Sequence, residues 1–217
     1  MTWRRARSKE QIEFRKKEIL DAAYQLFEKK EYESISLNSI ARELQISKPS
    51  IYRYFSSREE IFLDIYSHVF ELFYENLIEE FSTFSMNPMP EHVGNCWVKV
   101  YLNHEKLLNL MPLLGIALEK NSSESFLRTF KEKNIQLQQN IAGKIVELYP
   151  KLTIQAGFYI QYYAFLLASS HWSLTNTDQV MENILSEYRY MNINYSFEYV
   201  VSRGIEAHIK GFIGNQT

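Results

Sequence analysis

Six side chains that can contact a nucleic acid occur within eight consecutive positions, residues 47–54. Lysine and arginine can bind phosphate or guanine, hydroxyls can reach phosphates or base edges, and tyrosine can pack against a sugar-phosphate backbone. Ile51 and Phe55 are four positions apart, so on a helix they share one face and can anchor it inward. This pattern predicts a short recognition helix. Its polar residues are Ser47, Lys48, Ser50, Tyr52, Arg53 and Tyr54.

The residues before this segment predict two helices that could position it. Ser8 and Gln11 have the spacing of a capping box, and the apolar stripe that follows ends near residues 29–30. Ser36 is placed to cap a second helix, which is expected to end near residue 44.

Residues 45–47 then form a tight break before the third helix, which is expected over 49–54. Ser47 can cap this helix, and Pro49 is tolerated in its first turn because first-turn N–H groups lack intrahelical partners. Two helices joined by a three-residue turn have helix-turn-helix geometry, in which the second helix lies in the major groove of DNA.

The rest of the chain is also expected to be helical, so the predicted fold class is all-α: an N-terminal three-helix helix-turn-helix module plus a larger helical ligand-binding and dimerisation domain. Ser57 opens a long helix that ends near residue 84, and a proline-containing linker covers 85–92. The predicted domains are 1–57 for DNA binding, 58–84 as a connecting helix and 85–217 for ligand binding and dimerisation. Further helices are predicted over 92–109, 111–120, 123–149, 153–176, 178–190 and 196–213.

Composition and charge agree with this division. Hydrophobic residues make up 46% of the chain, which supports a buried core, and only 7 Gly and 5 Pro disfavour a turn-rich β architecture. Residues 1–17 carry a net charge of +5, whereas residues 61–217 carry −5. A basic N-terminal region on an otherwise acidic chain indicates that this region binds a polyanion. The alternative is a basic terminus that is only solvated. Arg4, Arg5 and Arg7 could enter a minor groove or form a solvated tail.

Other classes of protein find little support. No phosphate-binding glycine loop, catalytic triad or metal-ligand spacing is visible, so no catalytic residue, cofactor or metal is predicted. The lone Cys96 fits a buried position in a cytoplasmic protein, and no apolar segment of a secretory signal follows the basic N-terminus. Residues 152–177 contain no charged side chain, but their many polar groups favour a helix buried among other helices over a membrane span.

The stretch 36–61, SLNSIARELQISKPSIYRYFSSREEI, resembles the DNA-binding signature of the tetracycline-repressor-like (TetR) family of bacterial transcription regulators. The resemblance extends back through the first helix and covers about 45 residues. It implies that Ser36 and Ser47 cap their helices and that Lys48, Ser50, Tyr52 and Tyr54 face DNA. Arg58 replaces the more frequent lysine, where a phosphate contact is expected.

One residue departs from the family pattern. Gln45 stands in the turn where many members have glycine. If this residue adopts a positive φ angle, the non-glycine side chain costs about 1 kcal/mol.

The resemblance also implies a homodimer and a small-molecule effector. Members usually dimerise through their last two long helices, for which residues 152–177 and 196–213 are the best candidates, and bind a ligand in a helical cavity. Aromatic residues are plentiful after residue 60 and could line such a cavity. The candidate pocket residues are Trp97, Tyr101, His104, Phe126, Phe130, Tyr159, Tyr162, Tyr163 and Trp172.

The function expected from these features is a ligand-responsive transcription regulator, a repressor that binds a palindromic double-stranded operator as a homodimer and is released by a small molecule. The helix that begins near residue 58 would be the lever between the two activities. Two alternatives remain: a helical protein–protein adaptor with vestigial DNA binding, and a helical enzyme that uses the aromatic residues as a cavity.

Overall fold

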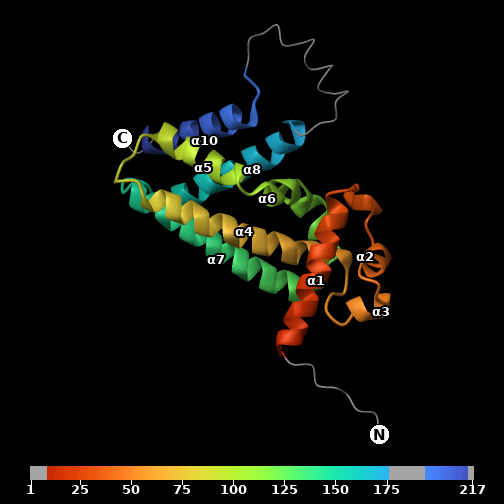
Figure 1. Cartoon of the computed structure of the whole chain (residues 1–217). Coiled ribbons are helices and arrows are strands. Elements are labelled where there is room, and N and C mark those ends of the chain that lie inside the picture. Colours follow the sequence, from red (N-terminus) through yellow and green to blue (C-terminus); the bar gives the residue numbers. More distant parts are fainter. Residues whose placement is uncertain (1–8, 176–193, 215–217) are drawn as a thin grey trace. The chain divides into compact units, whose positions relative to one another are not determined.

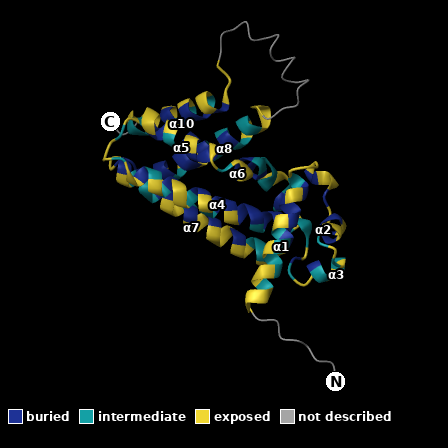
Figure 2. Cartoon of the chain, in the orientation of Figure 1, coloured by how far each residue is buried: buried dark blue, intermediate teal, exposed yellow. Residues whose placement is uncertain are grey.

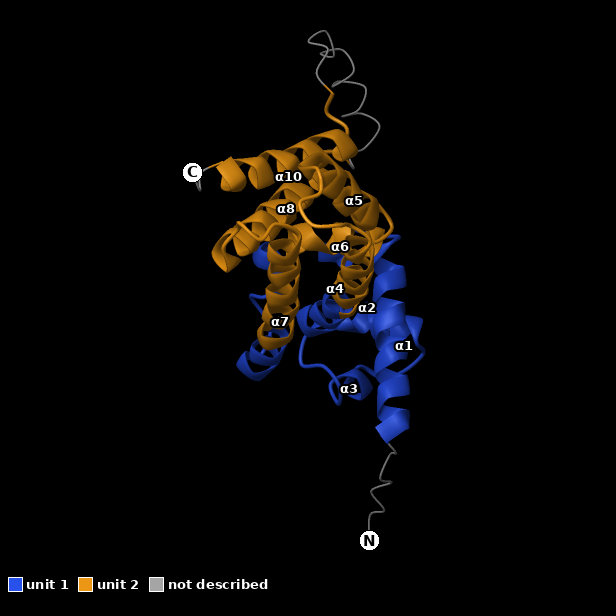
Figure 3. Ribbon diagram, turned by 90° about the vertical axis from the view of Figure 1, so that its left-hand side faces the viewer, with its two compact units in different colours: residues 1–67, 114–130 blue, residues 68–113, 131–217 orange. Residues whose placement is uncertain are grey.

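A computed structural model describes residues 9–175 and 194–214 of the chain, and these residues contain helices and no strand. The predicted all-α fold class is therefore confirmed (Figure 1). The chain divides into two compact units: Met1–Ser67 with Leu114–Phe130 forms unit 1, and His68–Leu113 with Lys131–Thr217 forms unit 2 (Figure 3).

Unit 1 contains the three N-terminal helices, α1 (Lys9–Phe27), α2 (Leu37–Glu43) and α3 (Lys48–Ile51). Their apolar stripes meet in one core, seen as the dark inner faces in Figure 2. Ile19, Ile40 and Ile51 are fully buried there, and α2 contacts both α1 and α3. Burying such side chains contributes about 1.5–3 kcal/mol each, which is what positions the short α3.

Local hydrogen bonds define both ends of α2. The Ser36 hydroxyl accepts from the backbone N–H of Ser39, and the Ser39 hydroxyl accepts from the backbone N–H of Ser36, which completes a capping box. At the other end, the backbone N–H of Ile46 donates to the Ala41 carbonyl at 2.9 Å, and that of Gln45 to the Arg42 carbonyl at 3.1 Å. This pair of bonds is a Schellman motif, and Gln45 has the positive φ of 53° that the motif requires.

Gln45→Gly is expected to raise the free energy of unfolding by up to about 1 kcal/mol, because glycine adopts a positive φ without steric cost. Chemical denaturation measures the change. Gln139→Gly is the matched control: this exposed glutamine lies inside a helix, so the same substitution should lose about 1 kcal/mol there. Equal losses in the two variants would contradict the assignment of strain to Gln45.

Two long helices contribute residues to both units, α4 (Arg58–Ser82) and α7 (Glu124–Leu148). Within unit 2 they lie side by side. Lys133 pairs with Glu71 at 2.8 Å, and the Asn140 amide donates to the Tyr74 hydroxyl at 3.2 Å.

The rest of unit 2 is built from α5 (Pro90–Leu102), α6 (Glu105–Leu110), α8 (Ile154–Thr175) and α10 (Phe197–Gly214). The last helix packs on both α5 and α8. Gly94 allows α5 to approach α10 closely, since a Cβ at this position would lie 2.5 Å from the Ser202 carbonyl oxygen. None of the described helices is long and apolar enough to cross a bilayer, the uncharged α8 included.

Several predicted helix bounds need correction. The predicted helix over 92–109 is two helices, α5 and α6, separated at Asn103 and His104; the apolar residues keep helical spacing across this break, which hid it in the sequence. The segment predicted as a helix over 111–120 is a 3₁₀ turn, η2 (Met111–Leu113), followed by a π-helical turn, η3 (Leu114–Leu118). The predicted helix over 178–190, the cap Ser8 and Arg4, Arg5 and Arg7 lie outside the described residues.

Candidate nucleic-acid interface

Helix α3 and the turn after it separate apolar from polar side chains. Ile51 and Phe55 are 0% and 2% exposed, as their four-residue spacing predicts. Tyr52 is 51% exposed, Arg53 is exposed, and Tyr54 is half-buried. The helix is shorter than predicted, because residues 52–54 form a turn in which the Tyr54 and Phe55 N–H groups both donate to the Ile51 carbonyl. One face of this segment is therefore anchored and the other is open to a partner.

The polar groups of α3 contact one another. The Lys48 ammonium lies 5.4 Å from the centre of the Tyr52 ring, a distance at which a cation and an aromatic face attract. Ser47 is the N-cap residue, but its hydroxyl makes no capping hydrogen bond; instead it lies 2.9 Å from the Ser50 hydroxyl. The side-chain cap predicted for Ser47 is thus wrong. Both hydroxyls and the ammonium group remain near the surface, where they can bind phosphates or bases.

Arg58 makes hydrogen bonds within the chain that the sequence did not predict. Its guanidinium donates to the backbone carbonyls of Tyr32 and Ile35 at 2.9 and 2.6 Å, and to the Glu59 carboxylate through two N–H groups at 3.2 and 2.9 Å. It also lies over the Tyr32 ring at 4.1 Å. All but one of its N–H groups are used in this way. Arg58 therefore joins α4 to the segment between α1 and α2, and its phosphate contact remains a prediction.

Sequence reasoning did not identify the partners of Arg58. Glu59 is 7% exposed and Tyr32 is 4% exposed, and the Tyr32 hydroxyl donates to Glu59 at 3.4 Å. Burial and the Glu59 carboxylate raise the pKa of Tyr32 above its ordinary value, so the phenol stays protonated. The only signal in the sequence was the capping-box spacing of Ser57 and Glu60, which does not reveal contacts made by Glu59.

Two family profiles match the chain and together cover most of it. The profile of bacterial regulatory proteins of the tetR family matches residues 19–65, which include α2 and α3. The profile of the tetracyclin repressor-like C-terminal domain matches residues 68–216. The chain belongs to the TetR family. The predicted resemblance is thereby confirmed, and members of this family are DNA-binding transcription regulators.

Solved structures of TetR-family regulators share the fold. A Mesorhizobium loti protein assigned to this family superposes with a TM-score of 0.61 at 17% identity, covering 96% of this chain and 98% of that one. Thermus thermophilus FadR, a TetR-family repressor solved with lauroyl-CoA, gives 0.59 at 16% identity, with coverage of 91% and 93%. Bacillus subtilis FadR, solved with stearoyl-CoA, gives 0.55 at 14% identity, with coverage of 90% and 98%. A comparison with curated protein sequences found no match.

The candidate pocket residues of this TetR-family chain fall into separate groups. Trp97 and Tyr101 are buried on α5, where Trp97 packs edge-on against Phe81 and Tyr101 stacks on Phe73 at 4.6 Å. His104 is the N-cap residue of α6; its Nε2 atom is buried without a hydrogen-bond partner among the described residues, and burial lowers its pKa.

The remaining pocket candidates lie on other helices, α7 and α8. Phe126 and Phe130 belong to unit 1. On α8, Tyr159 and Tyr162 are 53% and 51% exposed, and Tyr163 stacks on His208 at 4.2 Å. The Trp172 indole donates to the Asn109 side chain at 2.8 Å. A ligand-lining role for these residues remains a prediction.

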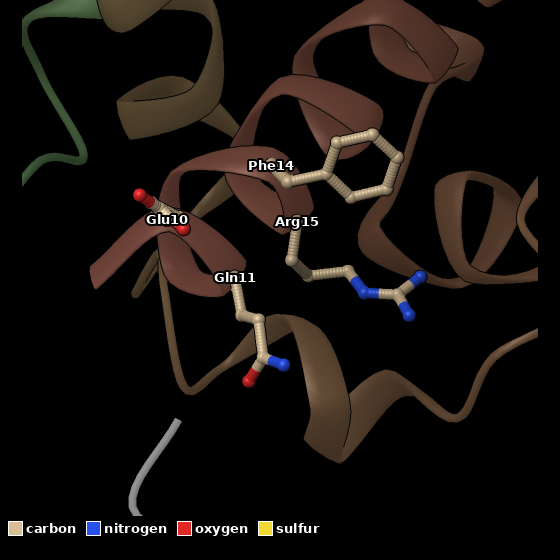
Figure 4. Close-up of a pocket in the computed structure, with 4 residues that line it drawn as sticks. All are labelled: Glu10, Gln11, Phe14 and Arg15. Carbon is tan, nitrogen blue, oxygen red and sulfur yellow. The ribbon is translucent and has the colours of Figure 1, made fainter. Parts of the chain in front are cut away.

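Two further features carry no assigned chemistry. A shallow depression on the first turns of α1 is lined by Glu10, Gln11, Phe14 and Arg15; the Phe14 ring and the Arg15 guanidinium extend to one side of the helix, away from Glu10 (Figure 4). Cys96 is half-buried, and burial with the nearby Glu80 raises the pKa of its thiol to about 11. Within 9–175 and 194–214, no group of three metal-ligating side chains could hold a metal ion.

Proposed function

We propose that this chain is a ligand-responsive transcription repressor that binds a palindromic operator as a homodimer and is released by a small molecule. The observation that carries the proposal is the division of faces on α3. Ile51 and Phe55 are buried, while Lys48, Tyr52 and Arg53 lie on the accessible side. A short helix with this arrangement can enter a major groove and contact bases and phosphates at once.

Ser36 and Ser50 add hydroxyls to this surface, at the N-terminus of α2 and within α3. Together with Arg58 at the start of α4, they would fix the register of the module on the duplex by binding phosphates. The proposed organisation keeps residues 1–57 as the DNA-binding domain, 58–84 as the connecting helix and 85–217 as the domain for ligand binding and dimerisation. A repressor of this kind acts in the cytoplasm.

The homodimer is proposed to form through α8 and α10. Tyr159, Tyr162 and Leu166 have helical spacing, lie on one side of α8 and are 53%, 51% and 38% exposed. No charged residue occurs over 152–177, and Tyr159 stacks on Phe212 of α10 at 6.0 Å. An accessible aromatic face without charges suits a second copy of this chain, because permanent interfaces are apolar and depleted of charge at their centre.

Leu166→Glu should split the dimer, since each protomer would bury an unpaired carboxylate in the interface. Sedimentation velocity would then show monomers at concentrations where the wild type is dimeric. Leu72→Glu is the matched control, because Leu72 lies on α4 with 39% exposure, close to the 38% of Leu166. Equal dissociation of both variants, or a dimeric Leu166→Glu protein, would place the interface elsewhere.

Acyl-CoA esters are the first effectors to test, because two FadR proteins of similar fold were solved with lauroyl-CoA and stearoyl-CoA. The buried Trp97 and Tyr101 on α5, and the half-buried His104 at the N-cap of α6, are the candidates for contact with the effector. Apolar walls with a few polar atoms are typical of cavities that hold such ligands.

Selection of bound fragments from the source genome tests the proposal as a whole. The wild-type protein should retain palindromic duplexes, and titration with lauroyl-CoA should release them in a fluorescence anisotropy assay. Retention of no duplex would refute DNA binding. Retention without release by any compound of a wider effector screen would limit the function to constitutive DNA binding.

A further inference from the structure

One buried carboxylate in unit 1 joins segments that are 63 residues apart. Glu60 is 2% exposed. Its Oε2 atom accepts a hydrogen bond from the Ser56 backbone N–H at 2.7 Å, and its Oε1 atom accepts from the backbone N–H and the hydroxyl of Ser123 at 3.1 and 2.6 Å. A buried carboxylate needs such partners, since an unpaired charge in a protein interior is costly.

These hydrogen bonds keep Glu60 ionised. Burial alone would raise its pKa, but the hydrogen bonds from Ser123 and Ser56 outweigh that effect, and the pKa lies below its ordinary value. The contacts are therefore charge-assisted, which makes them stronger than bonds between neutral groups.

The hydrogen bond from Ser56 connects Glu60 to residues 48–55, α3 and the turn after it, which are called the recognition segment below. Ser56 directly follows Phe55, the residue that anchors the turn after α3. The backbone N–H of Glu60 is in turn capped by the Ser57 hydroxyl at 3.1 Å. Glu60 thus fixes the loop between α3 and α4, and a shift of its carboxylate would move the end of the recognition segment.

The two hydrogen bonds from Ser123 connect Glu60 to a segment that is distant in the sequence. Ser123 directly precedes α7 and lies in the segment Leu114–Phe130, which is part of unit 1. The chain on both sides of this segment, α6 before it and residues 131–148 after it, is part of unit 2. The segment begins with the π-helical turn η3, a geometry often found at functional sites, and Phe130 packs edge-on against Tyr66. It falls within the match to the TetR C-terminal domain, residues 68–216.

We propose that the contact between Glu60 and Ser123 couples the recognition segment to the effector domain and determines how strongly an effector weakens operator binding. This inference rests on the proposed function. The chain is covalently continuous from α6 through η3 to Ser123. A shift of α6 or η3 on effector binding would therefore displace Ser123 and the Glu60 carboxylate bonded to it, and through Ser56 it would move the loop after α3.

A conservative set of variants isolates the contact. Ser123→Ala removes the hydrogen bond from the Ser123 hydroxyl to Glu60. Ser123→Thr keeps a hydroxyl at this position and should keep that hydrogen bond. In Glu60→Gln, the amide nitrogen must face either the N–H of Ser56 or the donors of Ser123. Because two donors cannot bond to each other, the hydrogen bonds on that side are lost without a change in side-chain size. Ser122→Ala is the matched control, because the Ser122 hydroxyl donates to the Leu118 carbonyl and not to Glu60.

Coupling between two sites is reciprocal, so it can be measured from the DNA side without an effector. Hydrogen–deuterium exchange of the full-length protein is followed over 114–123, with and without a duplex selected by the wild type. We expect the duplex to slow exchange in the wild type, Ser122→Ala and Ser123→Thr by on the order of tenfold. The slowing should be reduced in Ser123→Ala, in which the Ser123 backbone N–H still donates to Glu60, and lost in Glu60→Gln. Thermal unfolding curves would confirm that both are folded.

The possible outcomes separate this inference from the proposed function. If Ser123→Ala and Glu60→Gln keep the slowing that the duplex causes in the wild type, the contact is only structural and the coupling proposal is overturned. A lower melting temperature with unchanged slowing overturns it as well. If the wild type retains no duplex in the selection, the proposed function itself fails, and the coupling proposal fails with it.

Discussion

Tyr52→Ala is expected to weaken operator binding by about 1–3 kcal/mol, roughly five- to 150-fold in Kd, while the fold and the dimer remain intact. The phenol is 51% exposed and its ring lies beside the Lys48 ammonium, so the substitution removes a surface proposed to face DNA and the aromatic partner of that ammonium group. Because half of the side chain is in solvent, the free energy of unfolding should change by about 0.5 kcal/mol or less.

Fluorescence anisotropy with a selected duplex measures this loss, and circular dichroism follows stability. Tyr195→Ala is the matched control, since Tyr195 is 59% exposed and lies in unit 2. It should bind as the wild type does. If Tyr52→Ala unfolds the protein, or binds DNA unchanged, Tyr52 is not part of the interface.

The contact between Lys48 and Tyr52 adds a further expectation to this experiment. Lys48→Ala should reduce the slope of log K against log salt by about one counterion, because the phosphate contact proposed for Lys48 would be lost. The double variant should lose less than the sum of the single losses, since each single substitution already breaks the contact between the ammonium and the ring.

Gly94→Ala is expected to lower the free energy of unfolding by about 1–3 kcal/mol. An added Cβ would lie 2.5 Å from the Ser202 carbonyl oxygen, and this neighbour is backbone, so α5 and α10 would have to separate. The better helix propensity of alanine, worth about 1 kcal/mol, cannot offset such an overlap.

Chemical denaturation measures the change, and Gly143→Ala provides the comparison. Gly143 lies inside α7 with no atom within 4 Å of the added Cβ, so the same substitution should raise the free energy of unfolding by up to about 1 kcal/mol. A stabilised Gly94→Ala protein would show that the approach of α5 to α10 tolerates a methyl group.

The sequence was informative where local rules decide the structure. The spacing of Ile51 and Phe55 predicted which side of α3 is buried, and Ser36 predicted where α2 begins. The departure from glycine at Gln45 identified the residue of the turn between α2 and α3 that adopts a positive φ. Each of these features depends on residues within one helix or one turn, so residue types and spacing are sufficient.

Contacts between distant segments could not be predicted in the same way. Arg58 donates to the carbonyls of Tyr32 and Ile35, and backbone carbonyls are present at every position, so residue types carry no trace of this choice. The partner of Glu60 at Ser123 is equally invisible in one sequence. The break between α5 and α6 was missed because neither glycine nor proline marks it.

The composition of unit 1 also matters for protein engineering. A chimeric regulator made by joining the first 67 residues of this chain to a foreign C-terminal domain would separate α3 from Leu114–Phe130, which belongs to the same compact unit. The exchanged portion is discontinuous in sequence, so a graft that keeps the native interior must transfer both pieces, including the first turns of α7.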